Sequence, residues 1–453
     1  MNRVASRALA VLILVLVLTA GLGFFLAEYF AKSSQWVSFP ANPHIYNGGN
    51  LGCGQVYDRS GQLLLDMTNG WKYADDEVLR KSTLHWLGDT DGYIQASALP
   101  HYSDYITGYD LWNGLYTYGG IGGKMTLTIS AQVQKTALEA LDGRKGTVAV
   151  YNYKTGEILC AVTGPTYDPL DKPDIEGDTT GAYTGAYVNR FIMSTYTPGS
   201  IFKLVTAAAA LETVDNIDSL TFECTGRYDI GVDAVTCGRA HGVCDLQQAL
   251  ASSCNCFFAQ LSPLIGRDAI TEYVRRYGIT DSLKFDGITT IAGKYDVQGA
   301  ADVELAWSSI GQYTNQINPA RYLAFVGMIA GGGKGATPYL VKTAGTGYSA
   351  KTVLLEQQMD SETAALLQSY MKNNTDTVYG QENFGGLTIC AKSGTAEVGE
   401  GLTPHALFTG FVADERYPLA FIAVVENSGY GSSVCVPILS KVLQQCVHVM
   451  DAR

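Results

Sequence analysis

The feature that most constrains this chain is an uncharged stretch close to its N-terminus. No charged residue occurs in the twenty positions from Ala8 to Ala27. As a helix, this stretch would be roughly 30 Å long, which matches the hydrocarbon thickness of a bilayer. Arg3 and Arg7 precede the stretch and Glu28 follows it. The positive-inside rule therefore places the N-terminus in the cytoplasm.

Two interpretations of this stretch lead to the same location for the rest of the chain. The first is a single-pass anchor in the cell membrane, with residues 1–7 as a cytoplasmic tail and residues 8–30 as the transmembrane helix. The second is a cleaved signal peptide. The anchor is favoured, because the stretch is long for a signal peptide and lacks a small-x-small cleavage site near Ala27. In either case we expect the remainder to be extracytoplasmic.

The composition is that of a folded protein with more than one domain. Hydrophobic residues make up 47% of the 453 positions and charged residues only 16%. A chain of this length exceeds what one hydrophobic core usually serves. The formal net charge of −12 repels nucleic acid, and no basic stripe with interleaved aromatic residues offsets it. A nucleic-acid partner is therefore not expected.

The patterning divides the extracytoplasmic part into two regions. Residues 31–141 show little periodicity and are rich in Tyr, Gly and Asp, which predicts a small pedestal domain. Residues 142–453 begin with a strand-turn-strand pattern at 147–162 and return to strand patterns at 407–412 and 419–425. Strands from both ends predict an α+β fold, with one antiparallel sheet and helices on its faces.

Helical patterns fill the space between these strands and follow the last of them. The expected helices are 200–214, 246–264, 303–331, 361–372 and a final amphipathic helix at 436–450.

A nucleophile motif opens the first of these helices. Ser200-Ile201-Phe202-Lys203 is an S-x-x-K, and a helix beginning at Ser200 would place Lys203 on the same face. A serine hydroxyl needs an adjacent base, which a lysine can supply if desolvation lowers its pKa. The tetrapeptide alone carries no weight, because Ser369-Tyr370-Met371-Lys372 is a second match in the same chain.

Two further motifs follow Ser200 in a fixed order. Ser253-Cys254-Asn255 is an S-x-N, and Lys392-Ser393-Gly394-Thr395 is a K-[ST]-G-T. With these three motifs in this order, residues 126–453 resemble the class B penicillin-binding proteins, a family of peptidoglycan D,D-transpeptidases. Serine at position 393, where threonine is commoner in the family, keeps the hydroxyl. The resemblance implies the penicillin-binding transpeptidase fold, preceded by a pedestal and one transmembrane helix.

The resemblance implies a role for each catalytic residue. Ser200 attacks the carbonyl of a D-Ala-D-Ala stem peptide, and Lys203 accepts its proton. Ser253 and Asn255 complete the proton path and hold the substrate amide. Lys392 contributes positive charge toward the substrate carboxylate.

The resemblance also implies the substrate-binding residues, which are Ser393, Gly394 and Thr395. The hydroxyls of Ser393 and Thr395 bind the substrate's terminus, and the N–H groups of Ser200 and Thr395 form the oxyanion hole. The chemistry needs no cofactor.

The family implies an enzyme that cross-links peptidoglycan stem peptides through an acyl-enzyme on Ser200 and is inhibited covalently by β-lactams. Its expected partner is a polytopic glycan polymerase, contacted through the anchor and the pedestal. A D,D-carboxypeptidase, a serine β-lactamase and a β-lactam sensor are the alternatives. The sequence leaves open whether the enzyme serves elongation, division or sporulation.

A second group of residues has the composition of a structural metal site. Cys224, Cys237, His241 and Cys254 form C-x12-C-x3-H-x12-C, a Cys3His set suited to tetrahedral zinc. Some family members hold zinc at matching positions. A Cys224–Cys237 disulfide and reduced, buried thiols are the alternatives. Because Cys254 is the middle residue of S-x-N, a metal here would fix the loop that carries Asn255.

Overall fold

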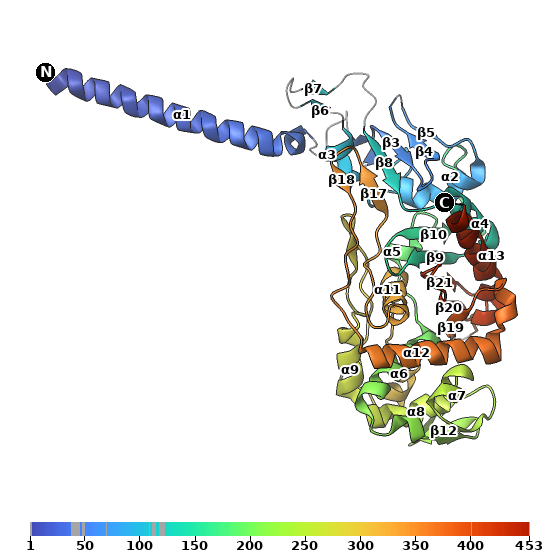
Figure 1. The fold of residues 1–453 in the computed structure, drawn as a ribbon. Helices are drawn as coiled ribbons and strands as arrows, with labels where there is room; N and C mark the ends of the chain where they lie inside the picture. The colour runs from blue at the N-terminus through green and yellow to red at the C-terminus, as the bar shows by residue number, and fades with distance from the viewer. Residues whose placement is uncertain are drawn as a thin grey trace.

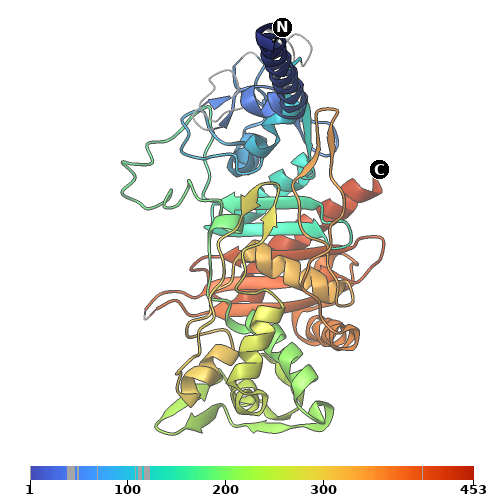
Figure 2. The same ribbon diagram turned by 90° about the vertical axis from the view of Figure 1, so that its left-hand side faces the viewer.

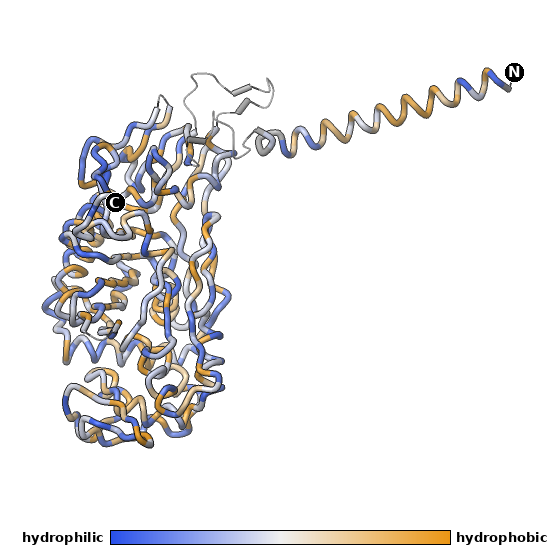
Figure 3. The backbone as a smooth tube through the Cα atoms, turned by 180° about the vertical axis from the view of Figure 1, so that it is seen from behind, coloured by the Kyte–Doolittle hydropathy of each residue, from blue (hydrophilic) through white to orange (hydrophobic). Residues whose placement is uncertain are grey.

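The N-terminal helix stands apart from the folded body in the computed structural model (Figure 1). This helix, α1 (Asn2–Val37), is long and apolar enough from Arg3 to Lys32 to cross a membrane by length and composition, and its hydrophobic side chains are exposed. Figure 3 shows the hydrophobic stretch along its middle. An apolar helix that fits a single-pass span is thus present where the sequence predicts one. The structure describes residues 2–37, 46–47, 50–68, 70–107, 109–110, 115–116, 123–399 and 401–452.

A five-stranded antiparallel sheet organises the larger part of the body. Its strand order is β10-β9-β21-β20-β19. The strands are β9 (Gly146–Asn152), β10 (Ile158–Gly164), β19 (Ile389–Ala396), β20 (His405–Val412) and β21 (Leu419–Val425). The two strands from the start of this region and the three from its end therefore share one sheet, as the sequence predicts. Every residue of β9, β10 and β21 is buried, which requires cover on both faces.

Helices supply that cover, and the α+β prediction is confirmed. On one face lie α4 (Ala131–Leu141) and α13 (Gly431–Asp451), whose apolar side chains form one hydrophobic cluster with the sheet. On the other face lie α5 (Arg190–Met193) and α11 (Pro319–Ala330) (Figure 1). The length and composition of α13 also suit a membrane span, but its packing on the sheet makes it a core helix.

A helical lobe lies beyond β19, on the side away from the N-terminal region (Figure 2). Its helices are α6 (Lys203–Thr213), α7 (Leu246–Ala251), α8 (Asn255–Ile265), α9 (Arg267–Arg276) and α10 (Asp302–Ser309), and α12 (Ser361–Asn374) lies between the lobe and the sheet. Two small antiparallel sheets complete the lobe: β11 (Phe222–Cys224) with β14 (Gly242–Cys244), and the hairpin of β12 (Arg227–Ile230) with β13 (Asp233–Thr236).

Three of the expected helices are wrong in extent. The helix predicted at 246–264 is interrupted between α7 and α8, because Ser253 adopts a left-handed conformation with φ of 54°. The helix predicted at 303–331 is likewise two helices, α10 and α11, with Gly311 at φ 86° between them. Ser200 lies in a 3-10 turn, η2 (Gly199–Phe202), and α6 begins only at Lys203.

A six-stranded sheet forms the N-terminal part of the body, in the order β18-β17-β8-β3-β4-β5. Its strands are β3 (Gln55–Tyr57), β4 (Leu63–Asp66), β5 (Lys72–Tyr73), β8 (Lys124–Leu127), β17 (Val341–Ala344) and β18 (Tyr348–Ser349), with α2 (Glu77–Leu87) beside them. Strands from distant parts of the sequence thus join this sheet too.

The remaining elements are short. They are β1 (Tyr46–Asn47), β2 (Asn50–Leu51), β6 (Tyr109–Asp110), β7 (Leu115–Tyr116), β15 (Lys284–Phe285), β16 (Ile288–Thr289), α3 (Ser103–Ile106), the 3-10 turns η1 (Leu99–Tyr102), η3 (Ile217–Ser219) and η5 (Gln381–Phe384), and the π-helical turn η4 (Thr375–Tyr379).

Buried side chains cover the β10 edge of the five-stranded sheet. Gln134 of α4 accepts a 2.9 Å hydrogen bond from the backbone N–H of Ala161 and donates one of 3.0 Å to the carbonyl of Ser82 in α2. The indole N–H of Trp86 donates to the carbonyl of Ala161 at 2.7 Å. The edge strand is therefore hydrogen-bonded to two helices, and Gln134 joins all three elements.

We expect Gln134→Leu to lower the free energy of unfolding by about 2–4 kcal/mol. The substitution leaves the buried N–H of Ala161 without a partner, at roughly 1–3 kcal/mol, and removes the side-chain donor to the carbonyl of Ser82, at about 0.5–1.5 kcal/mol. The measurement is denaturant unfolding of the detergent-solubilised chain, followed by tryptophan fluorescence. Gln132→Leu, at an exposed position of the same helix, is the matched control, with an expected change within about 0.5 kcal/mol. Equal effects of the two substitutions would contradict this role for Gln134.

Candidate active site

A cavity of about 410 Å³ lies between β19 and the helical lobe. It is lined by five of the residues that the three motifs predict, namely Ser200, Ser253, Asn255, Ser393 and Thr395. The two motif lysines, Lys203 and Lys392, are fully buried beside these residues. Segments that are far apart in the sequence therefore meet in one cleft.

Close backbone contact places Ser200 against β19. The N–H of Gly199 donates to the carbonyl of Gly311 at 2.9 Å. A Cβ at Gly199, whose φ is +53°, would lie 2.5 Å from the carbonyl oxygen of Thr395, so only glycine fits here. A Cβ at Gly394 would lie 2.8 Å from the carbonyl of Pro198. The two glycines thus allow the loop before Ser200 to approach the edge strand.

Lys203 lies at the centre of the polar network. Its Nζ is 3.1 Å from Ser200 Oγ, 2.7 Å from the carbonyl oxygen of Ser253 and 2.7 Å from Asn255 Oδ1. Burial disfavours the charged ammonium and lowers the pKa of Lys203 to about 8. The amine next to the serine hydroxyl is therefore much easier to deprotonate than an exposed lysine.

The hydroxyl of Ser253 lies between the two buried lysines. Its Oγ is 3.2 Å from Lys203 Nζ and 3.1 Å from Lys392 Nζ. Lys392 Nζ also donates to the carbonyl of Ser393 at 2.8 Å. Burial, together with the nearby positive charge of Lys203, holds the pKa of Lys392 well below its usual value. This chain of groups can pass a proton from one amine to the other through the hydroxyl.

Tyr379, which no sequence motif indicates, also lines the cleft. Its hydroxyl accepts a 2.9 Å hydrogen bond from the N–H of Ser393 and lies 3.0 Å from Ser393 Oγ. A tyrosine fourteen residues before its partner gives no recognisable spacing, so only the fold identifies it. Other cleft residues outside the predicted site set are Arg239, Trp307, Gln312, Val378, Glu397 and Tyr430.

The second S-x-x-K lies outside the cleft. Ser369 and Lys372 both lie on α12, and Lys372 Nζ forms an ion pair with Asp376 at 2.6 Å. Neither residue lines the cavity. The structure therefore places one S-x-x-K in the cleft and the other outside it, whereas the sequence could distinguish the two only by their neighbouring motifs.

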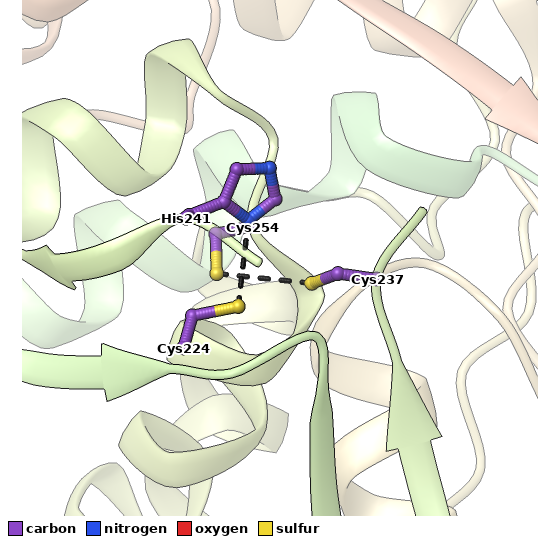
Figure 4. Close-up of side chains that lie close together, drawn as sticks. All are labelled: Cys224, Cys237, His241 and Cys254. Atoms are coloured by element: carbon purple, nitrogen blue, oxygen red, sulfur yellow. Dashed lines mark hydrogen bonds between the residues drawn. The ribbon is translucent and has the colours of Figure 1, made fainter. Parts of the chain in front are cut away.

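The four predicted metal ligands come together beside the cleft (Figure 4). One ligand atom from each of Cys224, Cys237, His241 and Cys254 lies within 4.8 Å of the others. Cys224 Sγ is 3.5 Å from His241 Nδ1, and Cys237 Sγ is 3.8 Å from Cys254 Sγ. All ten cysteines, each in the described part of the chain, are free, so the alternative Cys224–Cys237 disulfide is not formed.

Backbone donors surround the sulfur atoms of this cluster. The N–H groups of Asn255 and Cys256 point at Cys237 Sγ at 3.1 and 3.3 Å, and that of Phe257 points at Cys254 Sγ at 3.3 Å. The hydrogen bond from Cys254 lowers the pKa of the Cys237 thiol. The cluster therefore suits thiolate ligands, and it fixes the backbone on both sides of Asn255.

Comparison with known proteins covers the part of the chain that forms the cleft. Residues 146–444 match the family model of the penicillin binding protein transpeptidase domain. The chain is similar to peptidoglycan D,D-transpeptidase PbpA of Mycobacterium tuberculosis, at 28% identity over 363 residues, which cover 72% of this chain and 73% of that protein.

Two solved structures extend the comparison to the fold. Penicillin-binding protein A from M. tuberculosis, solved as a ceftriaxone acyl-enzyme complex, matches 87% of this chain and 98% of its own with a TM-score of 0.76 at 24% identity. Penicillin-binding protein PBP2 from Helicobacter pylori, solved in complex with MreC, matches 73% of this chain and 65% of its own with a TM-score of 0.65 at 21% identity.

We expect the side-chain ammonium of Lys203 to lose its proton near pH 8 instead of near its usual 10.5. The measurement is a titration of the chain labelled with ¹⁵N at the lysine Nζ atoms and followed by NMR, with Lys203→Met to assign the resonance. Lys372 is the internal control, because its exposed ion pair with Asp376 raises its pKa. A Lys203 resonance that titrates together with the exposed lysines would contradict the effect of burial.

Proposed function

The chain belongs to the penicillin-binding protein transpeptidase family, and we propose that it is a class B, serine-type D,D-transpeptidase that cross-links the D-Ala-D-Ala stem peptides of peptidoglycan. The observation that carries this proposal is the convergence of three distant motifs on one hydroxyl. Lys203 Nζ lies 3.1 Å from Ser200 Oγ, and Ser253 Oγ lies within 3.2 Å of both buried lysine amines. The name of the M. tuberculosis relative, a peptidoglycan D,D-transpeptidase, supports the same activity.

In the acylation step, Ser200 Oγ attacks the carbonyl carbon of the penultimate D-Ala while its proton passes to the neutral amine of Lys203. The backbone N–H groups of Ser200 and Thr395 stabilise the oxyanion that develops on the carbonyl oxygen. The peptide C–N bond then breaks. The proton moves from Lys203 through the hydroxyl of Ser253 to the nitrogen of the departing D-Ala, and the acyl group remains on Ser200.

In the second step, the amine of a neighbouring stem peptide attacks the acyl-enzyme carbonyl. Lys203 now accepts the amine's proton as the new peptide bond forms, and the Ser200 oxygen leaves and is reprotonated. The same site with water as acceptor would be a D,D-carboxypeptidase. Fast hydrolysis of β-lactams would instead make it a β-lactamase, so the lifetime of the acyl-enzyme separates these alternatives.

The substrate's terminal carboxylate is bound in this proposal by the hydroxyls of Ser393 and Thr395. Both lie on the edge strand and line the cleft. Lys392, in its protonated form, supplies positive potential beside these hydroxyls. Asn255 lines the cleft and is the proposed partner of the substrate amide, and its own amide nitrogen donates to the carbonyl of Thr236 at 2.8 Å. Gly394 contributes by its lack of a side chain, which leaves room for the Ser200 loop.

We expect penicillin to add to the chain once, on the peptide that contains Ser200, and to stay bound for much longer than the acylation takes. Ser200→Ala should abolish the adduct, because it removes the hydroxyl, 3.1 Å from the Lys203 amine, that is the proposed nucleophile. Intact-mass analysis followed by peptide mapping measures both. Ser369→Ala, at the other S-x-x-K, is the matched control and should label like the unmodified chain. Labelling of the Ser200→Ala variant would overturn the nucleophile assignment, and rapid loss of the adduct would favour a β-lactamase.

The geometry of Cys224, Cys237, His241 and Cys254 supports a structural zinc. Zinc bonds of roughly 2.3 Å to sulfur and 2.0–2.1 Å to nitrogen require tetrahedral S–S and S–N edges of about 3.8 and 3.6 Å. The Cys237–Cys254 sulfur pair measures 3.8 Å, the Cys224 Sγ to His241 Nδ1 pair measures 3.5 Å, and all four ligand atoms lie within 4.8 Å of one another. The residues therefore fit the metal, which would take no part in the chemistry and would hold the segment from Ser253 to Asn255 in place.

Purified, fully reduced protein should contain about one equivalent of zinc, as expected for a closed Cys3His site. Cys237→Ser should lose it and weaken penicillin acylation, because the loop with Asn255 loses an anchor. Elemental analysis and the acylation rate are the two measurements. Cys53→Ser, outside the cluster, should keep both. Zinc in the unmodified chain no higher than in Cys237→Ser would reject the site.

The apolar helix α1 and the charge pattern around it support the proposed location and domain organisation. Residues 1–7 are a cytoplasmic tail, 8–30 span the cell membrane, 31–141 form the pedestal, and 142–453 form the extracytoplasmic transpeptidase domain. A polytopic glycan polymerase that contacts the anchor and pedestal is the proposed partner. The solved complex of a penicillin-binding protein with MreC supports the wider idea that proteins of this fold work in assemblies.

A further inference from the structure

The outer edge of β19 is open to a partner strand only over part of its length. β19 is the last strand of the five-stranded sheet. In an antiparallel strand, the backbone groups of alternate residues point to the same side. The N–H of Ser393 points away from β20, toward Tyr379. Ile389, Ala391 and Thr395 therefore also direct their N–H and C=O groups outward.

Side chains from the segment after α12 occupy the first part of this edge. Gln381 accepts from the N–H of Ile389 at 2.8 Å and donates to its carbonyl at 3.0 Å, as a neighbouring strand would. Asn374 donates to the carbonyl of Ala391 at 2.9 Å. A peptide cannot pair with β19 at these positions, since the side chains of Gln381 and Asn374 already occupy the edge.

The occupied part of the edge ends at Ser393. Its N–H is bonded to the Tyr379 hydroxyl at 2.9 Å, and its carbonyl accepts from Lys392 Nζ at 2.8 Å. Thr395 is the first outward-facing residue whose backbone groups receive no side-chain hydrogen bond from the described part of the chain. The N–H of Thr395, next to Ser200, is therefore available to a bound peptide, whereas the edge from Ser393 back to Ile389 is not.

The ring of Tyr379 is held rigidly. It is 5% exposed, ends the π-helical turn η4, and packs edge-on against Phe408 with ring centroids 5.0 Å apart. π-helical turns occur frequently at functional sites. With its ring fixed by packing, the hydroxyl has one position, and that position is against Ser393.

The contact with Tyr379 matters because residue 393 is a serine, whose side chain has more rotational freedom than that of threonine. A threonine side chain is restricted in χ1 by its branched Cβ, whereas a serine hydroxyl turns among three rotamers. The 3.0 Å contact between Tyr379 and the Ser393 hydroxyl selects one of them. The contact with Tyr379 thus restricts χ1 of Ser393, as a branched Cβ would restrict χ1 of a threonine.

We propose that Tyr379 is a positioning residue that orients the Ser393 hydroxyl toward the terminal carboxylate of the substrate and ends the groove along β19. This inference rests on the proposed function. It explains how the cleft can favour a peptide that terminates in a carboxylate one residue after the scissile bond. A longer chain would have to run past Ser393, where the edge is already occupied.

The test compares two thioester substrates in the same sample of full-length protein. One is N-benzoyl-D-alanyl-thioglycolate, which ends in a carboxylate, and the other is its neutral amide. We expect Tyr379→Phe to lower kcat/KM for the carboxylate substrate about tenfold, mainly through KM. Without the tyrosine hydroxyl, the Ser393 side chain rotates freely and its hydrogen bond to the charged carboxylate is weakened. The amide substrate should change less than about twofold. Their ratio does not depend on how much protein is folded.

Three controls make the result decisive. Tyr417→Phe removes a tyrosine hydrogen bond, to Asp451 at 2.7 Å, at the far end of the sheet and should leave the ratio unchanged. In a Ser393→Ala background, Tyr379→Phe should have no further effect, whereas additive losses would overturn the proposal. Equal losses on both substrates would assign Tyr379 a purely structural role. Failure of penicillin to label the unmodified chain would instead refute the proposed function itself.

Discussion

The chemistry of this site depends on an amine that is buried beside a serine hydroxyl. Lys203 has no exposed surface, and burial lowers its pKa to about 8. An exposed lysine would remain charged at neutral pH and could not act as a base. The three motifs have value only in this setting, since Ser200, Ser253 and Asn255 all contact the same Nζ atom. The helical lobe and the sheet together supply the burial that neither provides alone.

Side chains satisfy the backbone groups at the two edges of the five-stranded sheet to different extents, and the less satisfied edge lies at the active-site cleft. Buried Gln134 and Trp86 satisfy the backbone at Ala161 on the β10 edge. On the β19 edge, side chains satisfy the backbone only as far as Ser393. Unpaired strand edges invite association with other chains. Here one short open stretch remains, and it lies beside the nucleophile.

The cysteine cluster ties the helical lobe to the same cleft. Cys254 lies between Ser253 and Asn255, and N–H groups on its C-terminal side point at the sulfur of Cys237. Any change in the cluster would therefore move two residues that contact the Lys203 amine. The hydrogen bonds from Asn255 and Cys256 to Cys237 can help to keep Ser253 in its left-handed conformation, which is costly for a residue with a side chain.

The sequence by itself determined the apolar N-terminal helix, the α+β class and the identity of the motif residues. These features depend on local patterns, namely an uncharged run, strand periodicity at both ends of one region, and short motifs in order. The ligand set of Cys224, Cys237, His241 and Cys254 was also visible in the spacing, and the fold brought the four side chains together.

Only the tertiary structure decided the features that arise between distant segments. It divided the helix predicted at 246–264 at Ser253, because the loop between α7 and α8 must reach both lysines. It distinguished Ser200 from Ser369, because the burial of Lys203 beside Ser200 is a property of the packed molecule. It also placed Tyr379 against Ser393, a contact set by packing on Phe408. Local sequence encodes which groups are available, whereas their desolvation and mutual distances exist only once the chain has folded.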